Sequence, residues 1–277
     1  MHRIQSMDAP TRGEPTRVVV LRRTQLVGAL YFLLALSQVT AKTNAPREFL
    51  ARVYTNAAKK TLPYRLLLPK DYDPAKRYPV ILYLHGAAAR GRDNAEPLNW
   101  GPQLWLDESR RGQRDFFLVV PQCPSNSGWV EVTGLGLGPM RESISLKLAL
   151  EVLTNALPKA FSIDPQRRYL TGVSMGGHAV WFLLNHRPGL FAAAVPVCAP
   201  GDAGNVTGTA AQTPVWIFHS DDDPLVSVAD ARAMVKAWRA HGGNPKYTEY
   251  TGLKHSSWKK AYAEREMFDW LFRQRLP

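Results

Sequence analysis

The sequence predicts a doubly wound α/β fold in one domain, with a mainly parallel central sheet of about eight strands and helices on both faces. Residues 78–86 and 116–122 are nearly continuous apolar runs, which is typical of strands buried on both faces. Beyond residue 140, strand-like segments alternate with segments whose apolar residues recur at helical spacing. A chain of 277 residues with 45% hydrophobic residues is long enough to bury one large core.

The expected elements alternate along the chain. Two strands joined by a short polar turn come first, then the two buried strands, and then a helix, a strand and a second helix. Two strands, a helix, a strand and a last helix complete the pattern. In order, the expected strands are 49–56, 61–69, 78–86, 116–122, 167–174, 191–198, 213–220 and 246–252, and the helices are 143–160, 176–187, 229–241 and 259–273.

The first 41 residues differ from the rest of the chain. Arginines precede a short apolar stretch at 26–36, and Val39-Thr40-Ala41 offers small residues where a signal peptidase cleaves. We expect residues 1–41 to be a signal peptide cleaved after Ala41, and residues 42–277 to be a single domain, secreted or periplasmic, without an integral membrane span. An uncleaved N-terminal membrane anchor is the alternative.

The composition argues against several function classes. The formal net charge is +12, but Lys and Arg are scattered and form no basic stripe interleaved with aromatic residues, so we expect no nucleic-acid partner. The glycines at 134, 136 and 138 follow no buried strand, which argues against a dinucleotide loop. The three aspartates at 221–223 are an alternative metal site, but no ligand spacing elsewhere supports it, so we expect neither a metal nor a cofactor. The oligomeric state is not predicted.

One serine has the surroundings of a nucleophile. The stretch Gly172-Val173-Ser174-Met175-Gly176 has the form G-x-S-x-G between a predicted strand and a predicted helix. This is the context in which a serine is held at a sharp turn, and the glycines relieve the crowding of that turn. A glycine-rich turn with a capping serine is the alternative interpretation.

A serine nucleophile needs a base and an acid that orients the base. His255 lies in a loop after the last predicted strand, where it is free to lean over Ser174, and Asp221, Asp222 and Asp223 follow the strand at 213–220. Packing, helical position or the leader segment explains the other histidines, which are His2, His85, His178, His186, His219 and His241.

A serine mechanism also needs two backbone N–H donors for the oxyanion. We expect one from Met175, after the serine, and one from the loop that follows His85-Gly86, either from Ala87 or from Ala88. Trp129 and Trp258 are candidates for contact with substrate, with core packing as the alternative for both.

In this order, the motifs LPYRLLLPKDYDP, YLHGAAARGRDN, VVPQCP, TGVSMGG, FHSDDDPLVSV and GLKHSSW resemble the α/β-hydrolase superfamily from about residue 47 to 275. The likeness is to secreted bacterial esterases related to polyhydroxybutyrate depolymerases, feruloyl esterases and prolyl oligopeptidase catalytic domains. The resemblance implies Ser174 as nucleophile, Asp223 as the acid and His255 as the base, with Ala87 and Met175 as oxyanion donors. The sequence departs from the family pattern at Ser220, where glycine is commoner.

The same resemblance implies a metal-independent serine hydrolase that cleaves carboxylic esters, carried by small molecules or polymers, through an acyl-enzyme. A serine peptidase of the prolyl oligopeptidase type and a non-catalytic binding protein on this scaffold are the alternatives. The superfamily's strand order also places Cys123 and Cys198 about three strand spacings apart, roughly 14 Å, so we expect two free thiols.

Overall fold

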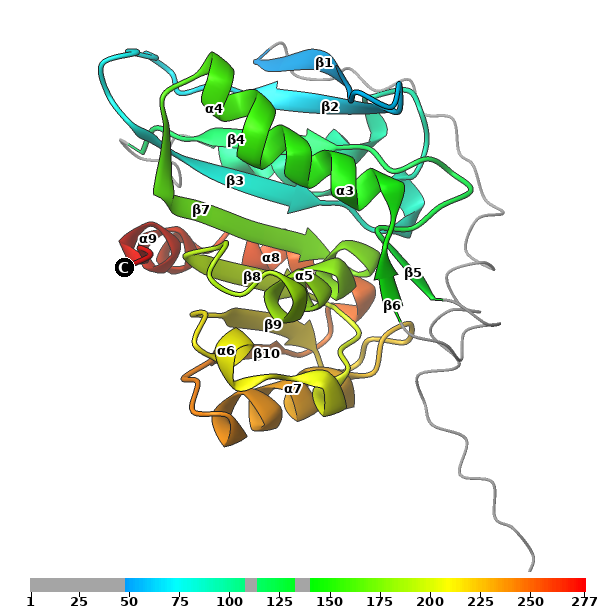
Figure 1. Ribbon diagram of the computed structural model, residues 1–277. Helices are drawn as coiled ribbons and strands as arrows, with labels where there is room; N and C mark the ends of the chain where they lie inside the picture. Colours follow the sequence, from blue (N-terminus) through cyan, green and yellow to red (C-terminus); the bar gives the residue numbers. More distant parts are fainter. Residues whose placement is uncertain (1–47, 108–113, 133–139) are drawn as a thin grey trace, which may run out of the picture.

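Eight strands form one central sheet in the order β1-β2-β4-β3-β7-β8-β9-β10 (Figure 1). The computed structural model describes residues 48–107, 114–132 and 140–277. β1 and β2 pair antiparallel with each other, and β2 pairs antiparallel with β4, whereas all pairs from β4 to β10 are parallel. The strands are β1 (Phe49–Thr55), β2 (Thr61–Leu67), β3 (Tyr78–Leu84), β4 (Phe117–Pro121), β7 (Ile163–Val173), β8 (Ala193–Val197), β9 (Trp216–Ser220) and β10 (Lys246–Tyr250).

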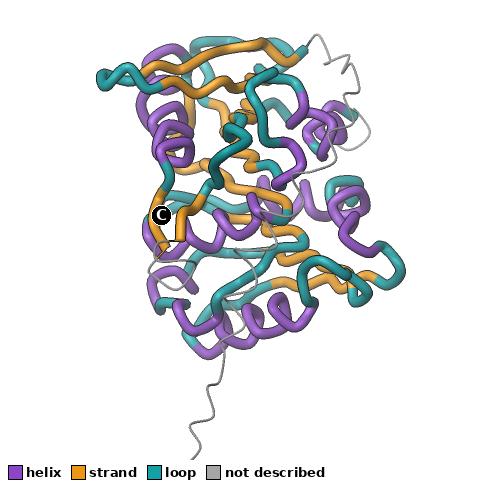
Figure 2. Tube along the Cα trace, turned by 90° about the vertical axis from the view of Figure 1, so that its right-hand side faces the viewer, coloured by secondary structure: helices purple, strands orange, loops and turns teal. Residues whose placement is uncertain are grey.

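Helices cover both faces of this sheet, as Figure 2 shows in the turned view. Alternate residues of β3 point to opposite faces, so Val80 and Leu82 join one core and Ile81 and Tyr83 the other. The first core includes side chains of α3 (Ile144–Glu151), α5 (Met175–His186), α6 (Gly208–Ala211) and α7 (Val228–Ala240). The second includes side chains of η4 (Pro102–Leu106), α8 (Ser257–Ala261) and α9 (Arg265–Arg273). The predicted fold class is confirmed.

Several element boundaries differ from the sequence prediction. β7 begins four residues early, at Ile163, because Ile163 pairs with Tyr78 of β3 ahead of a register shift in the ladder. The helix expected at 143–160 contains a π-helical turn, η5 (Val152–Ala156), before α4 (Leu157–Ala160).

The last predicted helix is two helices. α8 ends before Tyr262, a fully buried residue whose hydroxyl pairs with Thr171 Oγ1 at 2.8 Å, and α9 starts at Arg265. β5 (Val130–Val132) and β6 (Met140–Glu142) also form an antiparallel pair where the sequence analysis predicted no strand. Both differences reflect tertiary packing, which local periodicity does not encode.

Two sequence predictions fall outside the described residues. They are the signal peptide at 1–41 and the glycines at 134, 136 and 138, and both stay predictions. Within the described ranges, no helix has the length and apolar character needed to cross a membrane.

The parallel strands end at one edge of the sheet, and this positions the candidate site. Because β3, β7, β8, β9 and β10 all run in one direction, the loops that follow them gather at their carboxyl ends. These loops carry Gly86, Ser174, Cys198, Asp223 and His255, respectively.

Candidate active site

Ser174 occupies a strained turn between β7 and α5. Its φ of 54° and ψ of −115° lie in a region that residues other than glycine rarely adopt. The turn is tight: a Cβ added to Gly172 would lie 2.5 Å from the backbone of Gly176, and one added to Gly176 would lie 1.9 Å from the Leu84 carbonyl oxygen. Only glycine fits at both positions, which explains the G-x-S-x-G pattern.

The loop after β3 lies directly against this serine. A Cβ added to Gly86 would lie 3.5 Å from Ser174 Cβ. Ala87 is the first residue of the 3-10 helix η2 (Ala87–Ala89), and Met175 is the first residue of α5. The N–H groups at the start of a helix have no acceptor within the helix, so both backbone donors are available to a ligand.

His85 holds the loop through its side chain. The Cys123 N–H donates to His85 Nε2 at 3.0 Å, so the ring proton is on Nδ1, which donates to the Gly86 carbonyl at 2.7 Å. Burial lowers the pKa of His85 to about 4, which keeps the ring neutral at pH 7. In a trans peptide, C=O and N–H point in opposite directions, so fixing the Gly86 carbonyl also fixes the Ala87 N–H.

Asp223 is buried and fully hydrogen bonded. Oδ1 accepts from the N–H groups of Leu225 and Val226 at 2.9 and 3.0 Å, and Oδ2 lies 2.7 Å from His255 Nδ1 and 3.4 Å from His219 Nε2. Burial alone raises the pKa of Asp223, but the hydrogen bonds from His219 and His255 outweigh burial and hold that pKa well below its usual range. The carboxylate is therefore ionised at neutral pH.

Two neighbours of Asp223 tie its loop to the histidine loop. His255 lies in η7 (Lys254–Ser256), and the Lys254 N–H donates to Asp222 Oδ1 at 2.9 Å. Ser220 Oγ donates to the same carboxylate at 2.6 Å and accepts from the Leu253 N–H at 3.1 Å. Ser220, the departure from the family pattern, thus joins the two loops.

A serine, histidine and acid arrangement also needs a contact between the serine hydroxyl and the histidine. Within the described residues, no hydrogen bond joins Ser174 Oγ to His255, whose side chain is 22% exposed. In unliganded enzymes, catalytic hydrogen bonds are often long and tighten when substrate binds. The geometry therefore brings His255 and Asp223 together at the sheet edge where Ser174 stands.

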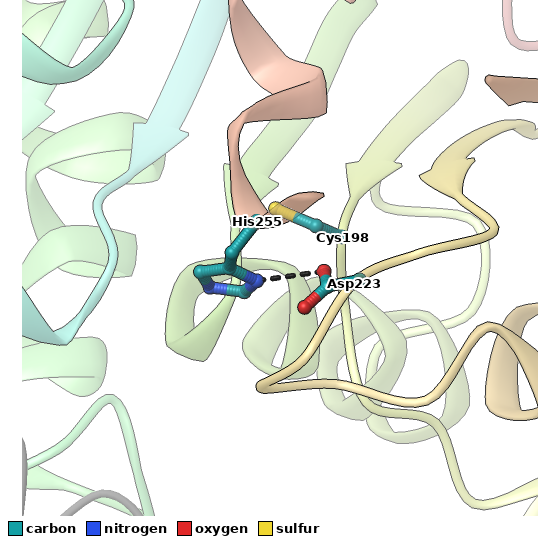
Figure 3. Close-up of side chains that lie close together, drawn as sticks. All are labelled: Cys198, Asp223 and His255. Atoms are coloured by element: carbon teal, nitrogen blue, oxygen red, sulfur yellow. Dashed lines mark hydrogen bonds and ion pairs between the residues drawn. The ribbon is translucent and has the colours of Figure 1, made fainter. Parts of the chain in front are cut away.

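Cys198 lies beside the His255 and Asp223 pair (Figure 3). One potential ligand atom from each of the three residues lies within 4.8 Å of the others, and zinc accepts all three ligand types. However, both Asp223 oxygens already accept hydrogen bonds, and burial, with the nearby Asp223 charge, raises the pKa of Cys198 to about 12. The arrangement is that of a protonated thiol packed against an acid and base pair, and Cys198 and Cys123 are buried free thiols.

The two tryptophans differ in their surroundings. Trp129 is fully buried, and its indole N–H donates to the His85 carbonyl at 3.0 Å. These contacts fit core packing, and substrate contact by Trp129 stays a prediction. Trp258 is 7% exposed and packs on Trp100, with the Lys259 ammonium 5.5 Å from its ring centre. Substrate contact by Trp258 stays a prediction.

A surface hollow lies elsewhere. Its lining includes Arg77, which precedes β3, and Ile163, which is the first residue of β7. It is therefore at the amino ends of the strands and takes no part in this site.

Sequence reasoning missed the residues that support the site. His85 and His219 look like ordinary strand-end histidines in the sequence, and their role depends on carbonyl and carboxylate groups brought near by loops. Their only sequence signal is their place at the ends of β3 and β9, next to the oxyanion loop and the acid.

Known proteins resemble this chain in sequence and in fold. Acyl-protein thioesterase 1 of Gibberella zeae is 25% identical over 233 residues, which cover 72% of this chain and 91% of that protein. A thermostable esterase of known crystal structure is 35% identical with a TM-score of 0.75, covering 82% of this chain and 63% of that chain, so our chain spans less than two thirds of its length. A ferulic acid esterase, 18% identical with a TM-score of 0.60, covers 81% of this chain and 98% of its own and shares the fold.

A family model also matches this chain. The match covers residues 55–243, which is more than half of the chain, and the family is described as "Putative esterase". The sheet order, the helices on both faces and the similarity to esterase structures agree with this match. The chain is therefore an α/β-hydrolase and belongs to this esterase family.

Proposed function

We propose that this protein is a serine esterase that cleaves carboxylic esters through an acyl-enzyme on Ser174. The observation that carries the proposal is the hydrogen-bonded pair of His255 and Asp223 at the sheet edge where Ser174 stands in a strained turn. This pairing of base and acid is what a serine needs to act as a nucleophile near neutral pH.

In the proposed reaction, His255 Nε2 takes the proton of Ser174 Oγ while this oxygen attacks the ester carbonyl carbon. The N–H groups of Ala87 and Met175 stabilise the negative oxygen of the tetrahedral intermediate. The protonated His255 then gives its proton to the leaving alcohol as the C–O bond breaks. Water, activated by His255, hydrolyses the acyl-enzyme and restores the serine.

Asp223 orients the base throughout this reaction. Its Oδ2 accepts from His255 Nδ1, so Nε2 of the neutral ring is left to accept the serine proton. The ionised carboxylate also stabilises the imidazolium that forms.

The test is hydrolysis of p-nitrophenyl acetate by the wild type and by S174A. We expect S174A to lose at least about 10⁴-fold in kcat, and a fluorophosphonate probe to label the wild type but not S174A. Unchanged hydrolysis by S174A would refute the proposal.

A substrate panel separates the alternatives. The panel contains an oxygen ester, a thioester and an amide of one acyl group. We expect faster cleavage of the oxygen ester than of the amide. Preferential cleavage of the amide would favour a peptidase. A folded wild type that neither hydrolyses the panel nor takes up the probe would favour a binding protein on this scaffold.

A further inference from the structure

His219 is a buried polar residue for which the proposed reaction has no use. It is in β9, four residues before Asp223, and its side chain is fully buried. Burying an imidazole without hydrogen bonds is costly, so its contacts show what it does for the protein.

The position of the ring proton follows from these contacts. His219 Nε2 lies 3.0 Å from the Val226 carbonyl oxygen, which only accepts hydrogen bonds, so Nε2 carries a proton. Nδ1 is buried and has no hydrogen-bond partner among the described residues. The contacts therefore place a proton on Nε2 and leave Nδ1 without a partner among the described residues.

The same N–H faces the acid of the site. His219 Nε2 lies 3.4 Å from Asp223 Oδ2, the oxygen that accepts from His255 Nδ1 at 2.7 Å. The same N–H is hydrogen bonded to the Val226 carbonyl, so it lies between this carbonyl and the carboxylate. The hydrogen bond therefore joins β9, which comes before Asp223, to Val226, at the end of the loop that carries Asp223.

This arrangement leaves the carboxylate little freedom to rotate. Backbone N–H groups of Leu225 and Val226 hold Oδ1, and the two histidine side chains hold Oδ2. Without the donor of His219, Oδ2 keeps one partner and the Val226 carbonyl loses a donor. The carboxylate could then turn away from His255.

We propose that His219 is a positioning residue for ester hydrolysis, whose Nε2–H keeps the Asp223 carboxylate aimed at His255 Nδ1. The inference rests on the proposed function, since it assigns His219 to the same acid and base pair. His219 acts through Asp223 and does not itself contact the reacting atoms.

The experiment compares two substitutions of similar length and volume. Gln in H219Q places an amide N–H near the position of Nε2, whereas Met in H219M has no donor. We expect H219M to lose about 10- to 100-fold in kcat for p-nitrophenyl acetate, which is the usual effect of removing a hydrogen bond to a charged group. H219Q should stay within about threefold of the wild type, and KM should change less than about threefold in both.

A proton NMR spectrum gives a readout that a purely structural role would not move. The far-downfield resonance of the His255 Nδ1 proton should persist in H219Q and move or disappear in H219M. Equal kcat values for the two variants, or an unchanged resonance in H219M, would overturn the inference. If H219M does not fold, H219N takes its place, because its shorter amide cannot reach Asp223 Oδ2.

The S174A variant separates failure of the positioning role from failure of the proposed function. If S174A is inactive while H219M and H219Q hydrolyse the ester equally, the positioning role is wrong and the proposed function stands. If S174A keeps full activity, both fail.

Discussion

The buried His85 should make folding stability fall in mild acid. Its pKa is about 4 in the folded protein, against 6.5 for a free histidine, because burial disfavours the charged ring. The unfolded chain therefore binds more protons than the folded one between pH 6.5 and 4, so the free energy of unfolding decreases as the pH falls through this range. Protonating Nε2 also breaks the hydrogen bond from the Cys123 N–H.

The two pKa values set the size of the effect. At pH 4.5 an unfolded histidine is almost fully protonated, whereas His85 in the folded protein is protonated about a quarter of the time. Relative to pH 7, this costs about 2 kcal/mol of folding free energy. Since domains have about 5–15 kcal/mol in total, the loss is large enough to measure.

Urea unfolding of the wild type and of H85N at pH 7, 5.5 and 4.5 measures the contribution of His85 to the free energy of unfolding. Other groups contribute to the acid sensitivity of both proteins alike, so the difference between their unfolding free energies isolates His85. We expect the wild type's advantage over H85N to shrink by about 2 kcal/mol between pH 7 and 4.5. The variant H241N, which removes an exposed histidine beside α7, controls for the general effect of losing a histidine. An advantage that stays constant over this range would refute the reasoning.

Two further substitutions test the packing around Ser174. G176A should destabilise the fold by more than about 3 kcal/mol or abolish soluble expression, because the new methyl group would lie 1.9 Å from the Leu84 carbonyl oxygen. The control is G208A, because no atom lies within 4 Å of the methyl group added there. Equal unfolding free energies for the two variants would contradict this packing. C198A should keep esterase activity within about threefold, because the buried Cys198 thiol packs beside the acid and base pair without reacting. It should lower the free energy of unfolding, measured by heat or urea, by about 1 kcal/mol. A hundredfold loss of activity in folded C198A would mean that the thiol takes part in the reaction.

The sequence predicted the centre of the sheet well because the strands there are buried on both faces. Runs such as 78–84 and 117–121 have no polar alternation to confuse with a helix, and the structure has strands there. Where tertiary contacts decide, prediction was weaker. The short hairpin of β5 and β6 has little periodicity of its own, and the break before α9 depends on burying Tyr262 against Thr171.

In the candidate site too, the sequence predicts residues that belong to a local motif better than residues that depend on tertiary contacts. Residues that follow a motif, such as Ser174 between its glycines, can be predicted locally because steric crowding dictates the glycines. The acid could be narrowed to three consecutive aspartates by position alone, and the family pattern then selected Asp223. Only the folded loops distinguish them physically: Asp223 turns inward to His255, whereas Asp222 accepts from Ser220 and Lys254.

His85 and His219 illustrate one structural use of a histidine that ends a buried parallel strand. Each is fully buried at the carboxyl end of its strand, where its ring lies against a carbonyl group of the loop that follows. An imidazole N–H can reach such a carbonyl from the strand, and for His85 burial also keeps the ring neutral at pH 7. His85 bonds to the Gly86 carbonyl in the oxyanion loop, and His219 bonds to the Val226 carbonyl in the acid loop. If this is the physical reason for both histidines, replacing either should affect the loop it holds and leave the other loop's contacts intact.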